Sequence, residues 1–473
     1  MLVSSHSANF WSFSIIKITM IRILFVLTLF SFGCATELTK TPDFDLLIRN
    51  VHIVDAVNDT IIPNQWIAVT GNTISQVGSM EEEPDTIGAD VIEGAGDFIM
   101  PGLWDNHIHF RGGDSLITEN KALIPHFISH GITTVREAGG DITPTIKTWQ
   151  KEIAASTMEG PRIFTSGPKL DGDRPAWAGS ISVTNSTEVA NALDSLQAIG
   201  IDYVKTYDGS LTDSTYYEIL RQTEERGLKV TGHMPLTANL REAIAQGLDG
   251  TEHLYYLLKA CSPLEDSLTR LGLGYGMMGA LVDSYDSLLA FELFSQLADA
   301  EVFVTPTLYI GKVLGGLAME SHQSDSMLQY MGPGIQKTYE GRIRSAKRNT
   351  STLSRQRDRL GATFRSMIKP LQDAGVSLLA GSDCGPYNSF VYPGTSLHSE
   401  LEVLVAAGLT PAEALRTSFV NGPKFVNQSS KYGRIEKGKV ADLVLLRSSP
   451  LEDIRHTMSI RSVILQGKVM RRI

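Results

Sequence analysis

Apolar and polar positions alternate along this chain in two different rhythms. Between residues 100 and 430, short apolar runs are each followed by a polar or glycine-rich loop and then by a helix-compatible segment such as VANALDSLQAIG. This order is typical of βα units with a parallel sheet, and eight units in series predict a closed (β/α)₈ barrel of the α/β class. The expected strands span residues 100–110, 133–137, 162–167, 203–207, 229–233, 250–253, 302–307 and 377–383.

The two ends of the chain carry the second rhythm, in which apolar and polar residues alternate over short runs. Residues 44–99 contain such runs, separated by turn residues that include Gly71 and Asn72, and predict a meander of antiparallel strands. Residues 431–473 show the same signals after a long helical region. Because the apolar face of a small sheet must be covered, we predict that the two ends form one small β-sandwich beside a barrel domain of residues 100–430.

One segment interrupts the βα rhythm. Residues 308–373 are charged and helix-favouring, with a run that reads QKTYEGRIRSAKRNTSTLSRQRDRL. They predict extra helices beside the mouth of the barrel. The alternative is a solvated helical face with no part in function.

Composition narrows the class of protein. Hydrophobic residues make up 42% and charged residues 20% of the 473 positions. This balance is ordinary for a globular chain and excludes a chain that is mostly disordered. The formal net charge is −10 and no basic cluster is present, so nucleic acid is not an expected partner. The three cysteines lie far apart without CxxC spacing and therefore indicate neither a thiolate zinc site nor a disulfide framework.

The first 36 residues have the pattern of an export signal. An apolar run at residues 21–32 follows Lys17 and Arg22 and is too short to span a bilayer. It ends in SFGC, which resembles the lipobox of bacterial lipoproteins and makes Cys34 the candidate for lipidation and a membrane tether. Met20 is an alternative start. We expect an exported protein, either lipid-anchored in the bacterial envelope or secreted.

Polar residues of the types that bind metals stand at the carboxyl ends of the expected strands, the face on which barrel enzymes carry their active sites. They are His107, His109, Lys205, His233, His253 and Asp383. His107 and His109 are two apart on one strand, so both side chains point the same way and can bind one metal. Each residue alone has an ordinary explanation, such as a hydrogen-bonded core histidine or a solvated lysine. Their convergence on one face predicts a metal centre.

At these motifs the chain resembles the amidohydrolase superfamily, and within it the imidazolonepropionase-like and prolidase-like branch. The resemblance runs from about Phe44 to Ile473, and the superfamily fold is a distorted (β/α)₈ TIM barrel beside a β-sandwich built from both chain ends. The motifs are PGLWDNHIHF, GITTVREAGG, DYVKTYDG, KVTGHMP, GLDGTEHL, VTPTL, LLAGSD and GRIEKGKVADLVLL.

The resemblance implies a centre with two divalent metal ions. Its ligands would be His107, His109 and Asp383 for the more buried ion, His233 and His253 for the second, and Lys205, as a carbamate formed with CO₂, for both. Lysine binds metals poorly while protonated, but nearby cations favour its neutral form, and carbamylation makes it an anionic oxygen donor. Zinc is the expected ion, with Mn, Co and Fe as alternatives.

The resemblance also implies hydrolysis of a small-molecule amide, either a dipeptide or an N-acyl amino acid. Water between two divalent ions has its pKa lowered toward neutrality, and Asp383 would accept its proton and pass it to the departing amine. One alternative is a mononuclear cyclic-amide hydrolase or deaminase of the same superfamily, with Lys205 uncarbamylated. The other is a lipid-anchored binding protein without turnover, against which the complete ligand set argues.

Substrate selection is expected in the loops that follow the strands. Tyr207 and Tyr255 each come two residues after an expected ligand and are candidates for contact with a carboxylate or the scissile carbonyl, with packing as the alternative. Arg136 ends the second strand and could bind a substrate carboxylate or serve as a structural ion-pair partner. The loop at residues 171–180 is either a lid or a long turn. The oligomeric state is not indicated.

Overall fold

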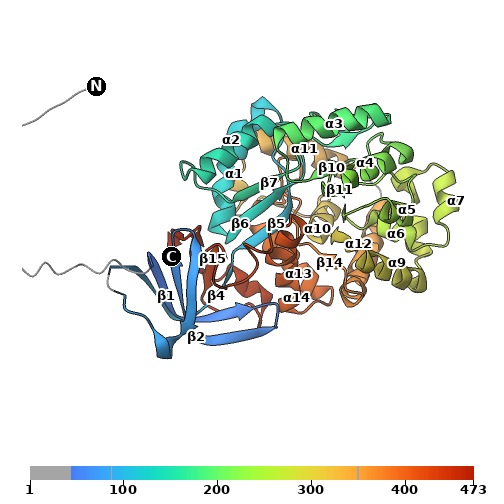
Figure 1. Cartoon of the computed structure of the whole chain (residues 1–473). Helices are drawn as coiled ribbons and strands as arrows, with labels where there is room; N and C mark the ends of the chain where they lie inside the picture. The colour runs from blue at the N-terminus through green and yellow to red at the C-terminus, as the bar shows by residue number, and fades with distance from the viewer. Residues whose placement is uncertain (1–43, 87, 349–350, 473) are drawn as a thin grey trace, which may run out of the picture. The chain divides into compact units, whose positions relative to one another are not determined.

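The computed structural model of the chain describes residues 44–86, 88–348 and 351–472 (Figure 1). The expected signal segment, with its apolar run and Cys34, lies outside the described residues. Among those that are described, none of the helices combines the length and the apolar character that a membrane span requires.

The two ends of the chain share one mixed sheet of seven strands. Its order is β17 (Lys468–Arg472), β16 (Ile460–Leu465), β15 (Leu443–Leu446), β4 (Asp90–Pro101), β1 (Leu46–Asp55), β2 (Thr60–Thr70) and β3 (Thr73–Ser79). The antiparallel pairing of β15 with β4 joins the ends, and Figure 1 shows β15 beside β4 and β1. The expected joint β-structure therefore exists as one hydrogen-bonded sheet, while its description as a two-layer sandwich stays a prediction.

The antiparallel meander predicted for residues 44–99 is wrong in its last strand. β1, β2 and β3 pair antiparallel, but β4 pairs with β1 in parallel. The reason lies in the connection, because the chain leaves β3 through a 3₁₀ turn at Met80–Glu82 and returns on the other side of β1. β4 also continues to Pro101, so the expected first barrel strand begins only at Leu103.

Alternate residues of the sheet pack into two different cores. Leu443 and Leu445 of β15 join an apolar cluster within the sheet segments, whereas Val444 and Leu446 join the main core with the βα units. Since successive strand residues point to opposite faces, the period-two pattern of the C-terminal segment fixes both contacts.

All eight expected strands of the βα region are present. They are β5 (Leu103–Ile108), β6 (Ile132–Glu137), β7 (Arg162–Thr165), β10 (Val204–Thr206), β11 (Val230–Gly232), β12 (Gly250–Glu252), β13 (Phe303–Thr305) and β14 (Ser377–Leu378). Two further short strands, β8 (Leu170–Asp171) and β9 (Ile181–Ser182), follow β7. All the ladders of this region are parallel.

The hydrogen bonds divide these strands into three parallel arcs, β5-β6-β7, β11-β10-β8-β9 and β12-β13-β14. The last arc meets the first, because the backbone N–H of Asp383 donates to His107 at 2.7 Å and that of His109 donates to Cys384 at 2.8 Å. The first and last strands are thus neighbours, as a barrel requires. A continuous eight-stranded closure stays a prediction.

Helices follow the strands as expected. Helix α3 shows why: Asn185 caps its start, its buried residues recur at Val189, Ala192, Leu193 and Leu196, and it ends at Gly200 with a φ of 74°. The helices of the βα region are α1 (Ile117–Ser129), α2 (Thr143–Ala154), α3 (Ser186–Ile199), α4 (Asp213–Glu225), α5 (Leu240–Ala245), α6 (Tyr255–Ala260), α7 (Glu265–Arg270), α8 (Met278–Asp283), α9 (Ser287–Asp299), α13 (Thr395–Ala406), α14 (Pro411–Phe419) and α15 (Asn421–Phe425).

The extra helices expected in residues 308–373 are also present. They are α10 (Leu308–Gly316), α11 (Pro333–Lys347) and α12 (Ser351–Asp373). Helix α10 begins directly after β13, and its first two N–H groups donate to the buried carboxylate of Glu400 on α13 at 2.9 and 2.6 Å. These bonds fix the start of α10 beside the strand ends.

Candidate metal centre

The structure brings all six predicted ligands together at the carboxyl ends of the strands. They come from β5 (His107 and, just after it, His109), β10 (Lys205), and the residues that follow β11 (His233), β12 (His253) and β14 (Asp383). His233 and His253 are half-buried and the other four are buried.

The first group consists of His107, His109 and Asp383. The Nε2 atoms of the two histidines lie 3.2 Å apart, and Asp383 Oδ1 lies 3.5 Å from His107 Nε2 and 3.2 Å from His109 Nε2. The Nδ1 atoms face outward, to Glu252 Oε2 at 2.6 Å and to the carbonyl oxygen of Gly139 at 3.0 Å. Both partners are acceptors, so Nδ1 carries the proton of each neutral ring and Nε2 offers a lone pair.

The second group consists of His233 and His253, whose Nε2 atoms lie 3.1 Å apart. Their Nδ1 atoms also face outward, His233 to Asp208 Oδ1 at 3.1 Å and His253 to Thr307 Oγ1 at 2.5 Å. Asp383 Oδ2 lies 4.0 Å from His253 Nε2, so the same carboxylate faces both groups.

The arrangement fits divalent cations. Two imidazole nitrogens that bind one tetrahedral zinc at about 2.0–2.1 Å stand about 3.3 Å apart, close to the 3.2 and 3.1 Å of the two pairs. Without a cation, the neutral rings of His107 and His109 would turn lone pairs toward each other. The outer contacts orient the rings as outer-sphere partners of metal ligands do.

Burial keeps three of these imidazoles neutral, the form that binds a metal. Loss of hydration, which penalises the charged ring, lowers the pKa of His107 to about 3 and that of His253 to about 4. The same cause holds the pKa of His109 well below its ordinary value.

Lys205 is a buried amine without a hydrogen bond. Its Nζ lies 3.7 Å from Glu252 Oε1, its side chain is 1% exposed, and burial lowers its pKa to about 8. A buried ammonium without a hydrogen bond is costly, so Nζ of Lys205 suits conversion to an anionic group that faces cations. Lys205 lines the same cavity as the ligands.

Asp383 is held in a strained backbone conformation. Its φ is 56°, and the neighbouring His253 and Thr307 have φ values of 64° and 48°, a region that costs non-glycine residues about 1–3 kcal/mol each. Asn388 donates from Nδ2 to the Asp383 carbonyl and, at 2.8 Å, to its Oδ1. Burial alone would raise the pKa of Asp383, but its electrostatic interactions with His107, His253, Arg111 and Lys205 lower it, so the carboxylate is ionised at neutral pH.

The sequence analysis missed the residues that orient the ligands. Glu252 is fully buried and accepts from His107, from Arg136 Nη2 at 2.8 Å and from Thr231 Oγ1 at 3.0 Å. Asp208 and Thr307 hold the second pair. Two of these residues could have been found from their positions beside candidate ligands, because Glu252 directly precedes His253 and Asp208 lies three residues after Lys205.

The predicted substrate-side residues fall into two groups. Tyr207 and Tyr255 line the cavity with the ligands, and the Tyr207 ring stacks on His233 with centroids 4.4 Å apart. Trp177 of the loop at residues 171–180 lines it as well. Arg136 does not line the cavity. It is 2% exposed and pairs with Glu252, which favours the alternative prediction that it is a structural ion-pair partner.

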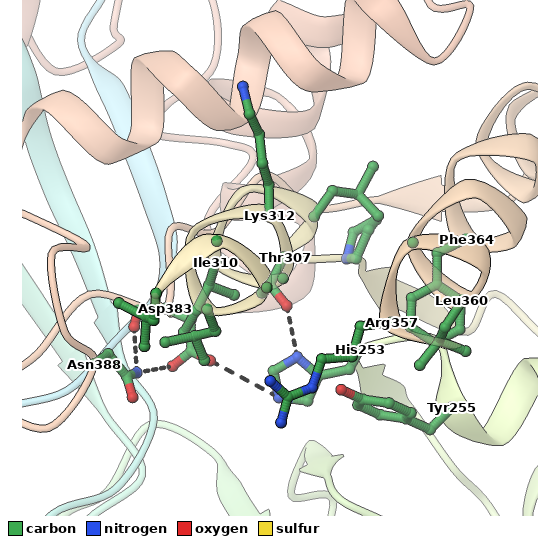
Figure 2. Close-up of a pocket in the computed structure, with 18 of the residues that line it drawn as sticks. His253, Tyr255, Thr307, Ile310, Lys312, Arg357, Leu360, Phe364, Asp383 and Asn388 are labelled. Atoms are coloured by element: carbon green, nitrogen blue, oxygen red, sulfur yellow. Dashed lines mark hydrogen bonds and ion pairs between the residues drawn. The ribbon is translucent and has the colours of Figure 1, made fainter. Parts of the chain in front are cut away.

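A cavity of about 1220 Å³ opens onto the metal centre. Figure 2 shows Asp383 and His253 beside helix residues such as Ile310, Leu360 and Phe364. The latter three belong to α10 and α12, so the extra helices form a wall of the cavity and are more than a solvated face.

Two buried cations line this cavity without an ion-pair partner in the part of the chain that the structure describes. Arg111 is 5% exposed, its guanidinium lies 4.0 Å from the Trp177 ring centroid, and its Nε has no hydrogen bond. Lys169 is 3% exposed, with Nζ 5.4 Å from the Tyr207 centroid. Burial, followed by the charge of Arg111, lowers the pKa of Lys169 to about 7. The cavity thus has a positively charged side.

Known proteins resemble this chain over most of its length. It is 22% identical to ochratoxinase of Aspergillus niger over 409 residues, 76% of this chain and 72% of that protein. It is 27% identical to adenine deaminase 3 of Rhizobium meliloti over 244 residues, half of this chain but only 39% of that enzyme. In structure it resembles a putative prolidase from Bifidobacterium longum, with a TM-score of 0.66, 23% identity and coverage of 91% of this chain and 96% of that one.

The family model named Amidohydrolase family matches residues 98–470, which include every strand of the βα region and all six candidate ligands. The prediction of amidohydrolase membership is confirmed, and with it the class of hydrolase that acts on C–N bonds. His107, His109 and Asp383 give this enzyme a candidate metal site. The chain belongs to the amidohydrolase family of metal-dependent hydrolases.

Proposed function

We propose that this chain hydrolyses the amide bond of an N-acyl amino acid or a dipeptide with the help of two divalent metal ions, zinc being the expected ion. One observation carries the proposal: two pairs of inward-facing histidine nitrogens, 3.2 and 3.1 Å apart, share the carboxylate of Asp383. A mononuclear enzyme needs only one such pair. Likeness to the putative prolidase supports the fold on which this proposal rests.

Lys205 would bridge the two ions as a carbamate. Its buried Nζ has no hydrogen bond, and its charge lowers the pKa values of His107 and His253, so it lies close to both histidine pairs. Bound there, the ions would supply Lewis acidity and acidify water.

Asp383 is the proposed proton carrier. Its carboxylate is ionised, faces both histidine pairs and is held by Asn388, so it can accept the proton of the attacking water. It then returns this proton to the nitrogen of the departing amino acid. The new C–O bond forms as Asp383 takes the proton of water, and the C–N bond breaks as the nitrogen receives that proton. The products are an amine and a carboxylic acid, which ionises to the carboxylate.

Arg111 and Lys169 would bind the carboxylate of the leaving amino acid. Both are buried cations without an ion-pair partner among the described residues, and both face the cavity beside Trp177. A substrate carboxylate would supply the missing negative charge, and the planar guanidinium of Arg111 suits it.

Two other functions are weaker proposals. A mononuclear deaminase or cyclic-amide hydrolase would leave the second histidine pair and Lys205 without a use, and the match to the deaminase covers only half of this chain. A binding protein without turnover would not need Asp383 beside both pairs. We also propose that the three arcs close into a distorted barrel beside a terminal β-sandwich, and that the chain is exported.

The test combines metal content with a substrate screen. The purified full-length chain is reconstituted with zinc, its metal is counted by mass spectrometry, and it is offered dipeptides, N-acyl amino acids, lactams and aminoheterocycles. We expect two metal ions per chain and release of a free amino acid. One ion per chain, or ammonia release or lactam opening without amide cleavage, would overturn the proposal.

A further inference from the structure

The cavity is larger than a dipeptide requires. Pockets for drug-sized ligands measure about 300–1,000 Å³, whereas this cavity measures about 1220 Å³. More than half of its lining residues belong to the segment from Pro306 to Arg365, which includes α10, α11 and α12. Space therefore continues beyond the reacting atoms, toward these extra helices.

Helix α10 gives the direction of this space. The helix starts directly after Thr307, which contacts the ligand His253. At about 1.5 Å per residue, Gly311 and Gly315 lie about 6 and 12 Å farther along the helix. Both glycines line the cavity, and nothing lies within 4 Å of the point where a Cβ would stand on either. The open space follows α10 for two turns away from the metal centre.

The opposite wall comes from α12. Leu360 and Phe364 are four residues apart on one face of this helix and both line the cavity (Figure 2). Phe364 packs on Tyr255 with ring centroids 5.2 Å apart, which ties this wall to the metal centre. Ile310 and Leu314 of α10 add aliphatic side chains. Leu317, directly after α10, lines the cavity as well. We call the space bounded by these side chains and by Gly311 and Gly315 the α10–α12 channel; its side chains are Tyr255, Ile310, Leu314, Leu317, Leu360 and Phe364.

The cavity therefore has two chemically different parts. Arg111, with its unpartnered buried Nε, lies on the charged side, and the side chains that define the α10–α12 channel are aliphatic or aromatic, although Lys312 and Arg357 of the same helices also line the cavity. Glycine destabilises a helix interior relative to alanine, yet the interior of α10 has Gly311 at a position where a side chain would enter the channel. A substrate with a carboxylate at one end and a flexible apolar chain at the other matches this division.

We propose that the α10–α12 channel holds an extended apolar acyl chain, and that the substrates are therefore N-acyl amino acids with long aliphatic acyl groups. This inference rests on the proposed amide hydrolysis. Water adds across the amide, the carbonyl carbon gains oxygen and becomes a fatty carboxylate, and the nitrogen leaves with a proton as the free amino acid.

The first test measures binding of the acyl part alone. The zinc-reconstituted full-length chain is titrated with butanoate, octanoate and dodecanoate below their micelle concentrations. Each buried methylene should tighten binding about fourfold until the channel is filled. Gly315→Leu should remove this gain, so that dodecanoate binds at least tenfold more weakly than to the wild type, while butanoate binding is unchanged.

The control is Gly341→Leu, the same substitution at an exposed glycine inside α11 that does not line the cavity. It should bind all three carboxylates like the wild type. Equal affinity of the wild type for butanoate and dodecanoate would overturn the inference, as would an equal loss for both in Gly315→Leu.

Turnover separates this inference from the proposed function. With N-acetyl, N-octanoyl and N-dodecanoyl forms of phenylalanine and proline, kcat/KM should rise with chain length in the wild type and not in Gly315→Leu. Hydrolysis of dipeptides without any dependence on chain length would overturn the channel and leave the proposed function standing. Length-dependent binding of fatty carboxylates without hydrolysis of any amide would support the channel and overturn the proposed function.

Discussion

Replacing Glu252 with glutamine should weaken metal binding, because it changes which ring nitrogen of His107 carries the proton. The Glu252 carboxylate accepts from His107 Nδ1 at 2.6 Å and from Arg136 Nη2 at 2.8 Å. A glutamine can keep only one of these acceptors, because its amide nitrogen donates. If the amide nitrogen faces His107, the ring must carry its proton on Nε2, the atom that points to His109 and Asp383.

Glu252→Gln should lower both the affinity for metal and the folding stability. Loss of an outer-sphere partner typically weakens metal binding about 10–100-fold, which corresponds to about 1.4–2.7 kcal/mol. Arg136, which is 2% exposed, also loses its anionic partner, and breaking a buried ion pair costs about 3–5 kcal/mol of folding stability. Metal affinity is measured by competition with a chromogenic chelator, and metal-free stability by urea unfolding.

The matched control is Glu265→Gln. Glu265 is also a carboxylate that pairs with a buried amine, Lys259 Nζ at 3.1 Å, and no contact joins it to a metal ligand in the described part of the chain. This variant should lose stability but keep wild-type metal affinity. Unchanged metal affinity in Glu252→Gln, or an equal loss in Glu265→Gln, would refute the reasoning on the His107 tautomer.

Other outcomes follow from the same contacts. Asp208→Asn should lower the metal content from two ions toward one, because Asp208 orients only His233 of the second pair; retention of two tightly bound ions would contradict this. Lys205→Ala should abolish activity and bicarbonate dependence, and unchanged kcat with full metal content would exclude the bridging role. The kcat/KM for an anionic substrate should fall as pH rises above about 7, since Lys169 loses its proton there; Lys169→Met should be less active at low pH and lack this fall.

The clustering of the six candidate ligands was predictable because each stands at or near the end of a strand that local sequence defines. A βα repeat is encoded over short distances, and parallel strands bring their carboxyl ends to one face. His107 in β5 and His109 directly after the strand needed only the period of two to point the same way. The extra helices of residues 308–373 were likewise visible as a charged, helix-favouring segment.

The tertiary structure alone decided what surrounds those ligands. Glu252 lies 145 residues from His107 in the chain, and no local pattern pairs them. The parallel return of β4 depends on which side of β1 the chain passes, which the strand pattern leaves open. Arg136, a candidate for substrate binding by sequence, is buried against Glu252, while Arg111 and Lys169 reach the cavity.

By itself, the sequence indicated the α/β class of fold, the candidate ligands and the family, because periodicity and strand ends are properties of neighbouring residues. Only the tertiary structure decided the orientation of each histidine ring, the strained backbone of Asp383 and the wall that α10 and α12 build beside it. These features arise where segments distant in the chain pack together, and their contact energies do not depend on the local pattern that a sequence displays.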